Sequence, residues 1–150
     1  MKDSEDIGSD YLHGYHPDTT TAYLNKLVGV THNYKVVYPQ CTNDHQVWHL
    51  SQWWNLQKYN PGQGYKIYHF ENNGGVDLDR HLTFMTYLND VPDGGTHWLH
   101  QDFYCPAIKG LTVIWPAQWM FTHKGVVSNT TTKYISTGWY VYEQEKNKLY

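Results

Sequence analysis

The chain has 150 residues, enough to bury the core of one domain, which we expect to span residues 1–150. Its net charge of -3 and scattered Lys and Arg residues argue against nucleic-acid binding through a basic face. The polar start and the lack of any apolar run near the ~18 residues of a membrane helix predict neither a signal peptide nor a membrane span. Two isolated cysteines, Cys41 and Cys105, fit a reduced setting, so we expect a soluble cytoplasmic protein.

The first third of the chain predicts one helix. Residues 1–18 are polar, and we expect them to be loosely ordered. Asp18 or Thr19 can cap a helix over residues 21–38, in which apolar side chains such as Leu24 and Leu27 share one face. Pro39 is expected to end this helix.

From residue 47 the pattern changes to short aromatic-rich runs bounded by Gly, Pro, Asn or Asp, with no helix between them. Tyr and Trp, 14 and 7 in number, favour strands. We therefore predict an antiparallel sandwich or barrel with its catalytic core at about residues 47–142. The predicted strands are residues 47–59, 64–71, 81–90, 96–105, 110–116 and 133–143.

An acidic residue follows a histidine by two positions at three places, and in a strand such residues share a face. The three pairs are His16/Asp18, His69/Glu71 and His100/Asp102. About one such pair is expected by chance from 10 His and 14 acidic residues, so the spacing alone is a weak metal signal. The first pair encloses Pro17 and precedes the predicted helix, which indicates a loop with an N-cap.

A metal site of two histidines and one carboxylate needs a third ligand from a neighbouring strand. His123 is the candidate, because three predicted strands separate it from His69, as a Greek-key arrangement requires. Only one predicted strand separates it from His100, which strains that alternative. His97 and His100 are interpreted as polar residues on or near a strand edge.

The last predicted strand carries a lysine on an apolar face. By period two, Lys133 shares a face with Ile135, Thr137 and Trp139. A lysine on an inward face is costly to bury unless an anion such as a dicarboxylate pairs with it. The opposite register, with Lys133 in solvent and the tyrosines at 134 and 140 inward, stays open from the pattern alone.

The segments QKYNPGQGYKIYHFE, LTFMTYLNDVPDGG, KGLTVIWPAQWMFTHKG and KYISTGWY resemble the prolyl 4-hydroxylase-like branch of the Fe(II)/2-oxoglutarate-dependent dioxygenases. The likeness runs from about Asn55 to Tyr142 and is strongest for small phage and bacterial members, which allows a phage-infected bacterial host as the setting. It implies a mainly β fold with N-terminal helical elements, a double-stranded β-helix or jelly roll.

The resemblance also assigns the site. It implies His69, Glu71 and His123 as metal ligands, with no further catalytic residue. It implies a cofactor pocket in which Lys133 binds the distal carboxylate of 2-oxoglutarate and Tyr87 donates a hydrogen bond to the cosubstrate. The pocket residues are Lys133, Tyr87, Tyr59, Thr137 and Trp139.

The implied activity is hydroxylation of a substrate C–H bond, with a peptidyl proline favoured, using Fe(II), 2-oxoglutarate and O2 and releasing succinate and CO2. Ascorbate is an optional accessory reductant in this expectation. A free small molecule as substrate is one alternative, and a non-catalytic jelly-roll module that binds a sugar or peptide is another. Two departures stand out: Glu71 replaces the usual Asp, and GGTHWLH replaces a Gly-Gly-Glu-Thr segment, which brings His97 and His100 near the pocket mouth.

Overall fold

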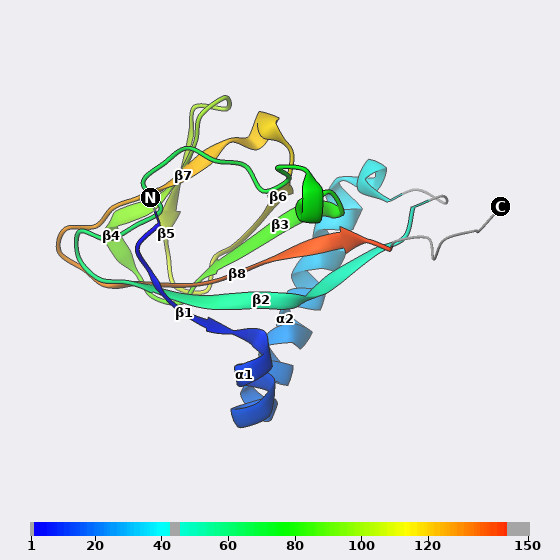
Figure 1. The fold of residues 1–150 in the computed structure, drawn as a ribbon, viewed down its shortest axis with the longest axis horizontal. Helices are drawn as coiled ribbons and strands as arrows, with labels where there is room; N and C mark the ends of the chain where they lie inside the picture. Colours follow the sequence, from blue (N-terminus) through cyan, green and yellow to red (C-terminus); the bar gives the residue numbers. More distant parts are fainter. Residues whose placement is uncertain (1, 43–45, 144–150) are drawn as a thin grey trace.

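Two antiparallel β-sheets face one another in the computed structural model of the protein, which describes residues 2–42 and 46–143 (Figure 1). The larger sheet has the order β1-β2-β8-β3-β6, and the smaller has the order β5-β4-β7. The strands of the larger sheet are β1 (Glu5–Gly8), β2 (Trp48–Tyr59), β8 (Lys133–Tyr142), β3 (Arg80–Tyr87) and β6 (Thr112–Pro116). Those of the smaller are β5 (Phe103–Ala107), β4 (Val91–Trp98) and β7 (His123–Val126). The expected double-stranded β-helix is confirmed.

Strand β3, which lies between β8 and β6, is buried on both faces, which explains its nearly continuous apolar sequence. Phe84 points toward the helices, where it packs in a cluster with Leu27 and Tyr140. Met85 and Tyr87 point the other way, into the core between the two sheets. The larger sheet therefore separates a helical layer from the layer that holds the cavity described below.

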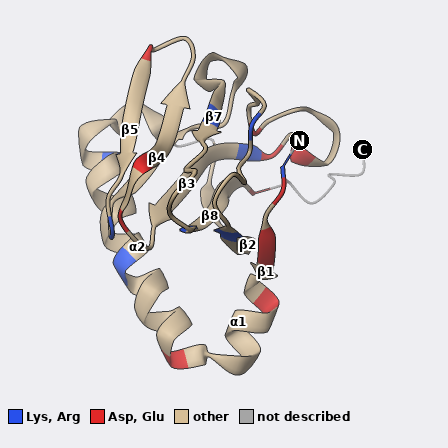
Figure 2. Cartoon of the chain, turned by 90° about the vertical axis from the view of Figure 1, so that its left-hand side faces the viewer, with Lys and Arg blue, Asp and Glu red and all other residues tan. Residues whose placement is uncertain are grey.

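The expectation of loose order for residues 1–18 is wrong for the part described. Residues 5–8 form β1, which pairs antiparallel with β2, and α1 (Ser9–Tyr15) follows directly. The acidic strand β1 pairs with β2, and its Glu5 forms an ion pair with Lys58 of β2 at 3.2 Å (Figure 2). The Ser9 hydroxyl donates to the carbonyl of Gln52 at 2.6 Å, and Leu12 packs into the core. These contacts join distant segments, so local polarity did not reveal them.

Helix α2 (Pro17–Val37) begins earlier than expected. Pro17 occupies its first turn, His16 is the N-cap, and Asp18 lies inside the helix, where its charge complements the positive end of the dipole. The helix ends before Pro39, as predicted, and that proline opens the short 3-10 helix η1 (Pro39–Cys41). Within the described parts of the chain, neither α1 nor α2 combines the length and apolarity that membrane crossing requires.

Two strand predictions need correction. Residues 64–71 form no regular strand; single bridges at Tyr65 and His69 tie this segment to its neighbours. Residues 96–105 are not one strand but the end of β4, a turn and β5, with Asp102 in the turn at φ 47°. As a result four strands, not three, lie between His69 and His123. Residues 99–102 fitted the strand pattern in sequence, but their backbone forms a turn and is not extended.

Gly138 marks a close approach that the core requires. A Cβ there would lie 2.6 Å from Cβ of Trp54 and 2.7 Å from Cε1 of Phe84. We expect Gly138→Ala to lower the free energy of unfolding by about 1–3 kcal/mol through overpacking. Gly29→Ala is the matched control: a Cβ there meets nothing within 4 Å inside α2, and stability should rise by about 0.5–1 kcal/mol. Urea denaturation followed by circular dichroism measures both; equal effects would contradict the packing argument.

Candidate metal centre

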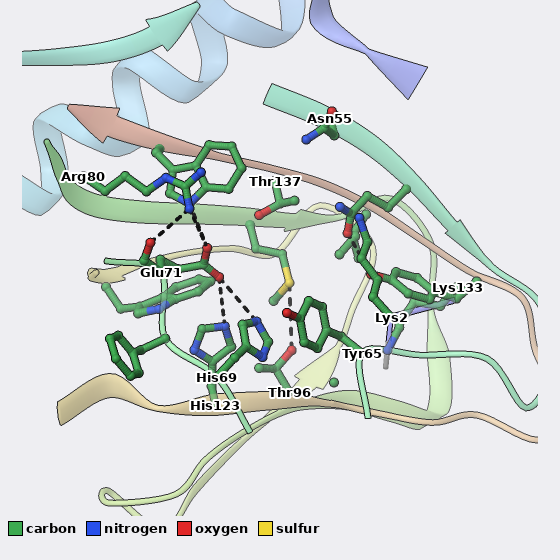
Figure 3. Close-up of a pocket in the computed structure, with 18 of the residues that line it drawn as sticks. Lys2, Asn55, Tyr65, His69, Glu71, Arg80, Thr96, His123, Lys133 and Thr137 are labelled. Carbon is green, nitrogen blue, oxygen red and sulfur yellow. Dashed lines mark hydrogen bonds and ion pairs between the residues drawn. The ribbon is translucent and has the colours of Figure 1, made fainter. Parts of the chain in front are cut away.

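A cavity of about 320 Å³ lies on the inner face of the larger sheet (Figure 3). Strands β2, β3 and β8 form one wall, β7 and the segment before β3 contribute the other, and Lys2 reaches in from the N-terminus. In Figure 3 the labelled residues Glu71 and Arg80 lie toward one end, and Lys133 and Lys2 toward the other. The cavity therefore has a carboxylate–histidine end and a cationic end.

His69, Glu71 and His123 come together at the first end. The Glu71 Oε1 atom lies 3.5 Å from Nε2 of His69 and 3.4 Å from Nε2 of His123. The possible ligand atoms of these three residues all lie within 4.8 Å of one another, close enough to hold a metal ion. Within the described residues, no other group of three His, Cys, Asp or Glu side chains does so. Two histidines and one carboxylate are a facial ligand set suited to Fe(II).

Backbone contacts bring these side chains together. His69 N–H donates to the carbonyl of His123 at 3.0 Å, and His123 N–H donates back at 2.8 Å. Each imidazole Nδ1 also lies close to a carbonyl two residues earlier, Ile67 at 3.0 Å and Phe121 at 2.9 Å. With Nδ1 held by these carbonyls, Nε2 of each ring is directed at Glu71, where it can donate to the carboxylate or offer its lone pair to a metal ion.

Aromatic rings hold the imidazoles in place. Tyr65 stacks on His69 with ring centroids 3.6 Å apart, and Trp115 meets His123 edge-on at 5.0 Å. His123 is 5% exposed, so its ring has little freedom to turn away from the cavity. The site is thus pre-organised by packing as well as by hydrogen bonds.

Glu71 is ionised at neutral pH despite its burial. Burial by itself raises the pKa of this carboxyl, but hydrogen bonds and charge interactions with His123 and His69 outweigh it and hold the pKa well below its usual range. Its second oxygen, Oε2, accepts a hydrogen bond from the indole N–H of Trp139 at 2.9 Å. A negative oxygen therefore faces the two imidazoles at neutral pH.

Lys133 occupies the other end of the cavity and is 4% exposed. Its ammonium donates to the carbonyl of Val126 at 2.9 Å and lies 5.3 Å from the ring centroid of Tyr59. No carboxylate pairs with it among the described residues. Burial accordingly lowers the pKa of Lys133 to about 8. A cation without a counter-charge in a closed site favours an anionic ligand.

The structure resolves the register that the sequence left open for β8. Ile135, Thr137 and Trp139 line the cavity with Lys133, whereas Tyr134 is exposed. Tyr140 packs on the opposite, helical side of the sheet. Of the two registers that the pattern allowed, the structure has the one with Lys133 inward.

The other expected pocket residues also line the cavity. The Tyr87 hydroxyl shares a hydrogen bond of 2.7 Å with the Thr96 hydroxyl, and the Tyr59 hydroxyl donates to Oε1 of Gln57 at 2.8 Å. Burial raises the pKa of both phenols, so they keep their protons and can act as donors. Thr137 donates to the carbonyl of Phe84 at 3.0 Å.

His97 and His100 are absent from the cavity lining described. His97 lies in β4, where its Nδ1 is 2.9 Å from the Tyr68 hydroxyl and its Nε2 is 3.5 Å from Asp102. His100 lies in the turn after β4, edge-on to Trp119. Residues 99–102 form a turn rather than a strand, and among the described residues no group of three possible metal ligands includes His100 or Asp102.

Arg80 and Tyr65 are site residues that sequence reasoning missed. Arg80 is the one arginine among the 150 residues, a signal that could have drawn attention to it. It opens β3, and its Nη1 lies 3.7 Å from Glu71 Oε2. Lys2 was missed because it is distant in sequence; a bridge to Tyr65 brings it to the cavity.

The family model of the 2OG-Fe(II) oxygenase superfamily matches residues 54–141, which include every cavity residue argued above except Lys2. The chain belongs to this superfamily. It is a 2-oxoglutarate-dependent dioxygenase, and the family implies Fe(II), 2-oxoglutarate and O2. The three ligand atoms described above fit such an ion, since they offer two imidazole nitrogens and one carboxylate oxygen.

Solved structures of similar fold include prolyl hydroxylases. The 2OG complex of the viral collagen prolyl hydroxylase of Paramecium Bursaria Chlorella virus-1 has a TM-score of 0.70 and 19% identity, covering 93% of this chain and 78% of that one. A Pseudomonas putida prolyl-4-hydroxylase has a TM-score of 0.67 and 16% identity, covering 96% and 74%. A Phytophthora capsici prolyl 4-hydroxylase has a TM-score of 0.63 and 21% identity, covering 91% of this chain and 47% of its own. Comparison with curated proteins yields no significant match.

The lowered pKa of Lys133 predicts a pH limit on cosubstrate binding. Without an anion the ammonium predominates only below about pH 8, so 2-oxoglutarate affinity should fall above that pH, by up to about tenfold per unit. Calorimetric titration of the Mn(II)-loaded protein between about pH 7 and about pH 9 measures this dependence. Two controls should lack the fall: 2-oxobutyrate, which has no distal carboxylate, and the variant Lys133→Met. An affinity for 2-oxoglutarate that is constant over this range would contradict the role of Lys133.

Proposed function

We propose that this dioxygenase hydroxylates a peptidyl proline and releases succinate and CO2. The observation that carries the proposal is the cavity with His69, Glu71 and His123 at one end and the unpaired, buried Lys133 at the other. The fold shared with prolyl hydroxylases supports the choice of substrate class by analogy.

In this proposal Nε2 of His69, Nε2 of His123 and Oε1 of Glu71 hold Fe(II). When bound, the ion with 2-oxoglutarate and O2 supplies the oxidising chemistry that inserts oxygen into a C–H bond. The residues hold the ion in place: the Nδ1 protons fix both imidazoles, and the ionised carboxylate offsets part of the metal charge.

Lys133 binds the distal carboxylate of 2-oxoglutarate as a point charge, without the two-pronged geometry of an arginine. One hydrogen bond joins the hydroxyls of Tyr87 and Thr96, and when Thr96 donates it, the Tyr87 hydroxyl hydrogen is free to point toward a bound carboxylate. The buried aromatic walls exclude water from this end, which strengthens the ion pair. Ascorbate remains a prediction of the sequence resemblance, tested by omitting it from the assay.

A free small molecule is the second candidate substrate. The cavity end near Arg80 is lined by polar side chains such as Asn73 and Asp77, which suit a polar substrate. Phe70, beside them, offers an apolar ring against which a proline could pack. The non-catalytic binding module considered from the sequence is disfavoured by the match to an oxygenase family.

Loss of either histidine tests the metal site. We expect His69→Ala and His123→Ala to abolish Fe(II) binding and uncoupled succinate production, because each removes one of three ligands. Anaerobic addition of Fe(II) and 2-oxoglutarate should give a visible charge-transfer band in the parent protein and none in either variant. His100→Ala is the matched control, since His100 belongs neither to the ligand group nor to the cavity lining, and it should retain the band. Turnover retained in both ligand variants would contradict the assignment.

Substrate class is tested separately with the active enzyme. Incubation with proline-containing peptides should give a mass increase of one oxygen, located on proline by fragmentation, together with succinate. The same peptides with alanine in place of proline are the control and should stay unmodified. Succinate produced with a free metabolite pool but with no peptide would favour the second candidate.

A further inference from the structure

The two oxygens of the Glu71 carboxylate have different surroundings. Oε1 faces the histidines, at 3.4 Å from His123 Nε2 and 3.5 Å from His69 Nε2. Oε2 points away, accepts the Trp139 indole N–H at 2.9 Å, and lies 3.7 Å from Nη1 of Arg80 (Figure 3). The side chain is therefore held from both sides, with one oxygen presented to the ligand group and one retained by the protein.

Arg80 is itself fixed by several contacts. Its Nη1 donates to the backbone carbonyl of Glu71 at 3.0 Å, and its Nη2 pairs with Oδ1 of Asp77 at 2.8 Å. The guanidinium carbon lies 3.8 Å from the ring centroid of Trp139. These contacts engage both terminal nitrogens of Arg80 and stack its plane on the indole, so Arg80 holds Glu71, Asp77 and Trp139 together.

A glutamate at this position raises a problem of coordination. Carboxylates bind metals through one oxygen or through both. Three single-point protein ligands leave three positions of a six-coordinate ion free, enough for a chelating 2-oxo acid and O2. The longer, more flexible side chain of Glu71 could turn both oxygens toward the ion, which would take one of those positions.

We propose that Trp139 and Arg80 form a clamp that retains Oε2 of Glu71, so that the glutamate serves as a single-point ligand through Oε1. The proposal rests on the metal site proposed above. Trp139 and Arg80 are positioning residues: they act on the orientation of a ligand, and a single-point glutamate would leave room on the ion for a chelating 2-oxo acid.

The test separates metal binding from cosubstrate binding. Trp139→Phe keeps the ring and removes the N–H. We expect its Mn(II) affinity to be unchanged or higher, because the freed oxygen can join the ion, while 2-oxoglutarate affinity on the loaded protein falls about tenfold or more. Anaerobic Fe(II) with 2-oxoglutarate should then give a weakened charge-transfer band. Trp119→Phe, an exposed tryptophan outside the cavity lining, is the matched control and should change neither affinity.

Arg80→Met provides a second variant, should the first lose its fold. It should likewise keep or raise Mn(II) affinity while lowering 2-oxoglutarate affinity. A double-mutant cycle with Glu71→Asp adds a direct test, because a shorter carboxylate reaches the indole less well; Trp139→Phe should then have a smaller effect in that background. Parallel losses of metal and 2-oxoglutarate binding in the folded variants, or no change in either, would overturn the clamp.

Failure of the proposed function would look different. If His69→Ala still binds the metal, the ligand assignment is wrong. If that variant loses the metal while Trp139→Phe behaves as the parent protein, only the clamp is wrong.

Discussion

The reciprocal backbone hydrogen bonds between His69 and His123 are the contact on which the rest of the site depends. They hold an otherwise irregular segment against the first residue of β7 and bring two ring nitrogens to a single carboxylate oxygen. A segment with few ladder bonds is an unusual support for a rigid site. Its stability comes instead from rings packed on the imidazoles, from carbonyls that orient them, and from Glu71 N–H bonded to the carbonyl of Ala117 at 3.1 Å.

Charge organises the cavity along its length. The histidine end holds the Glu71 carboxylate, which its partners keep ionised. The opposite end holds Lys133, whose pKa is lowered by burial. A dicarboxylic 2-oxo acid bridging a metal and an ammonium satisfies both ends at once. Burying an unpaired lysine lowers the folding stability of the protein without a ligand, and binding of an anion restores that stability. The N-terminal segment contributes to the same wall through Lys2, which the family model, matching residues 54–141, does not include.

The clamp on Glu71 requires two residues that are far apart in sequence to lie side by side. Arg80 begins β3, Trp139 lies near the end of β8, and the two strands are neighbours in the larger sheet. Pairing of β3 with β8 therefore stacks the guanidinium on the indole and aims both at one oxygen. Sheet topology, rather than the ligand segment itself, sets the orientation of the carboxylate. This link connects the register of the core to the chemistry of the site.

The sequence by itself determined the β-rich class, most strand positions and, with the family resemblance, the His69–Glu71–His123 group and Lys133. Period-two alternation and turn residues are local signals, and they suffice for β2, β3, β6 and β8. Only the tertiary structure decided that residues 5–15 are ordered, that residues 96–105 turn, and which face of β8 is inward. Each of these depends on pairing or packing with residues far along the chain, as when β1 finds β2 or Tyr134 is left exposed. The place of Arg80 in the site also depended on tertiary structure, because no local sequence pattern indicates which residue a single arginine will contact.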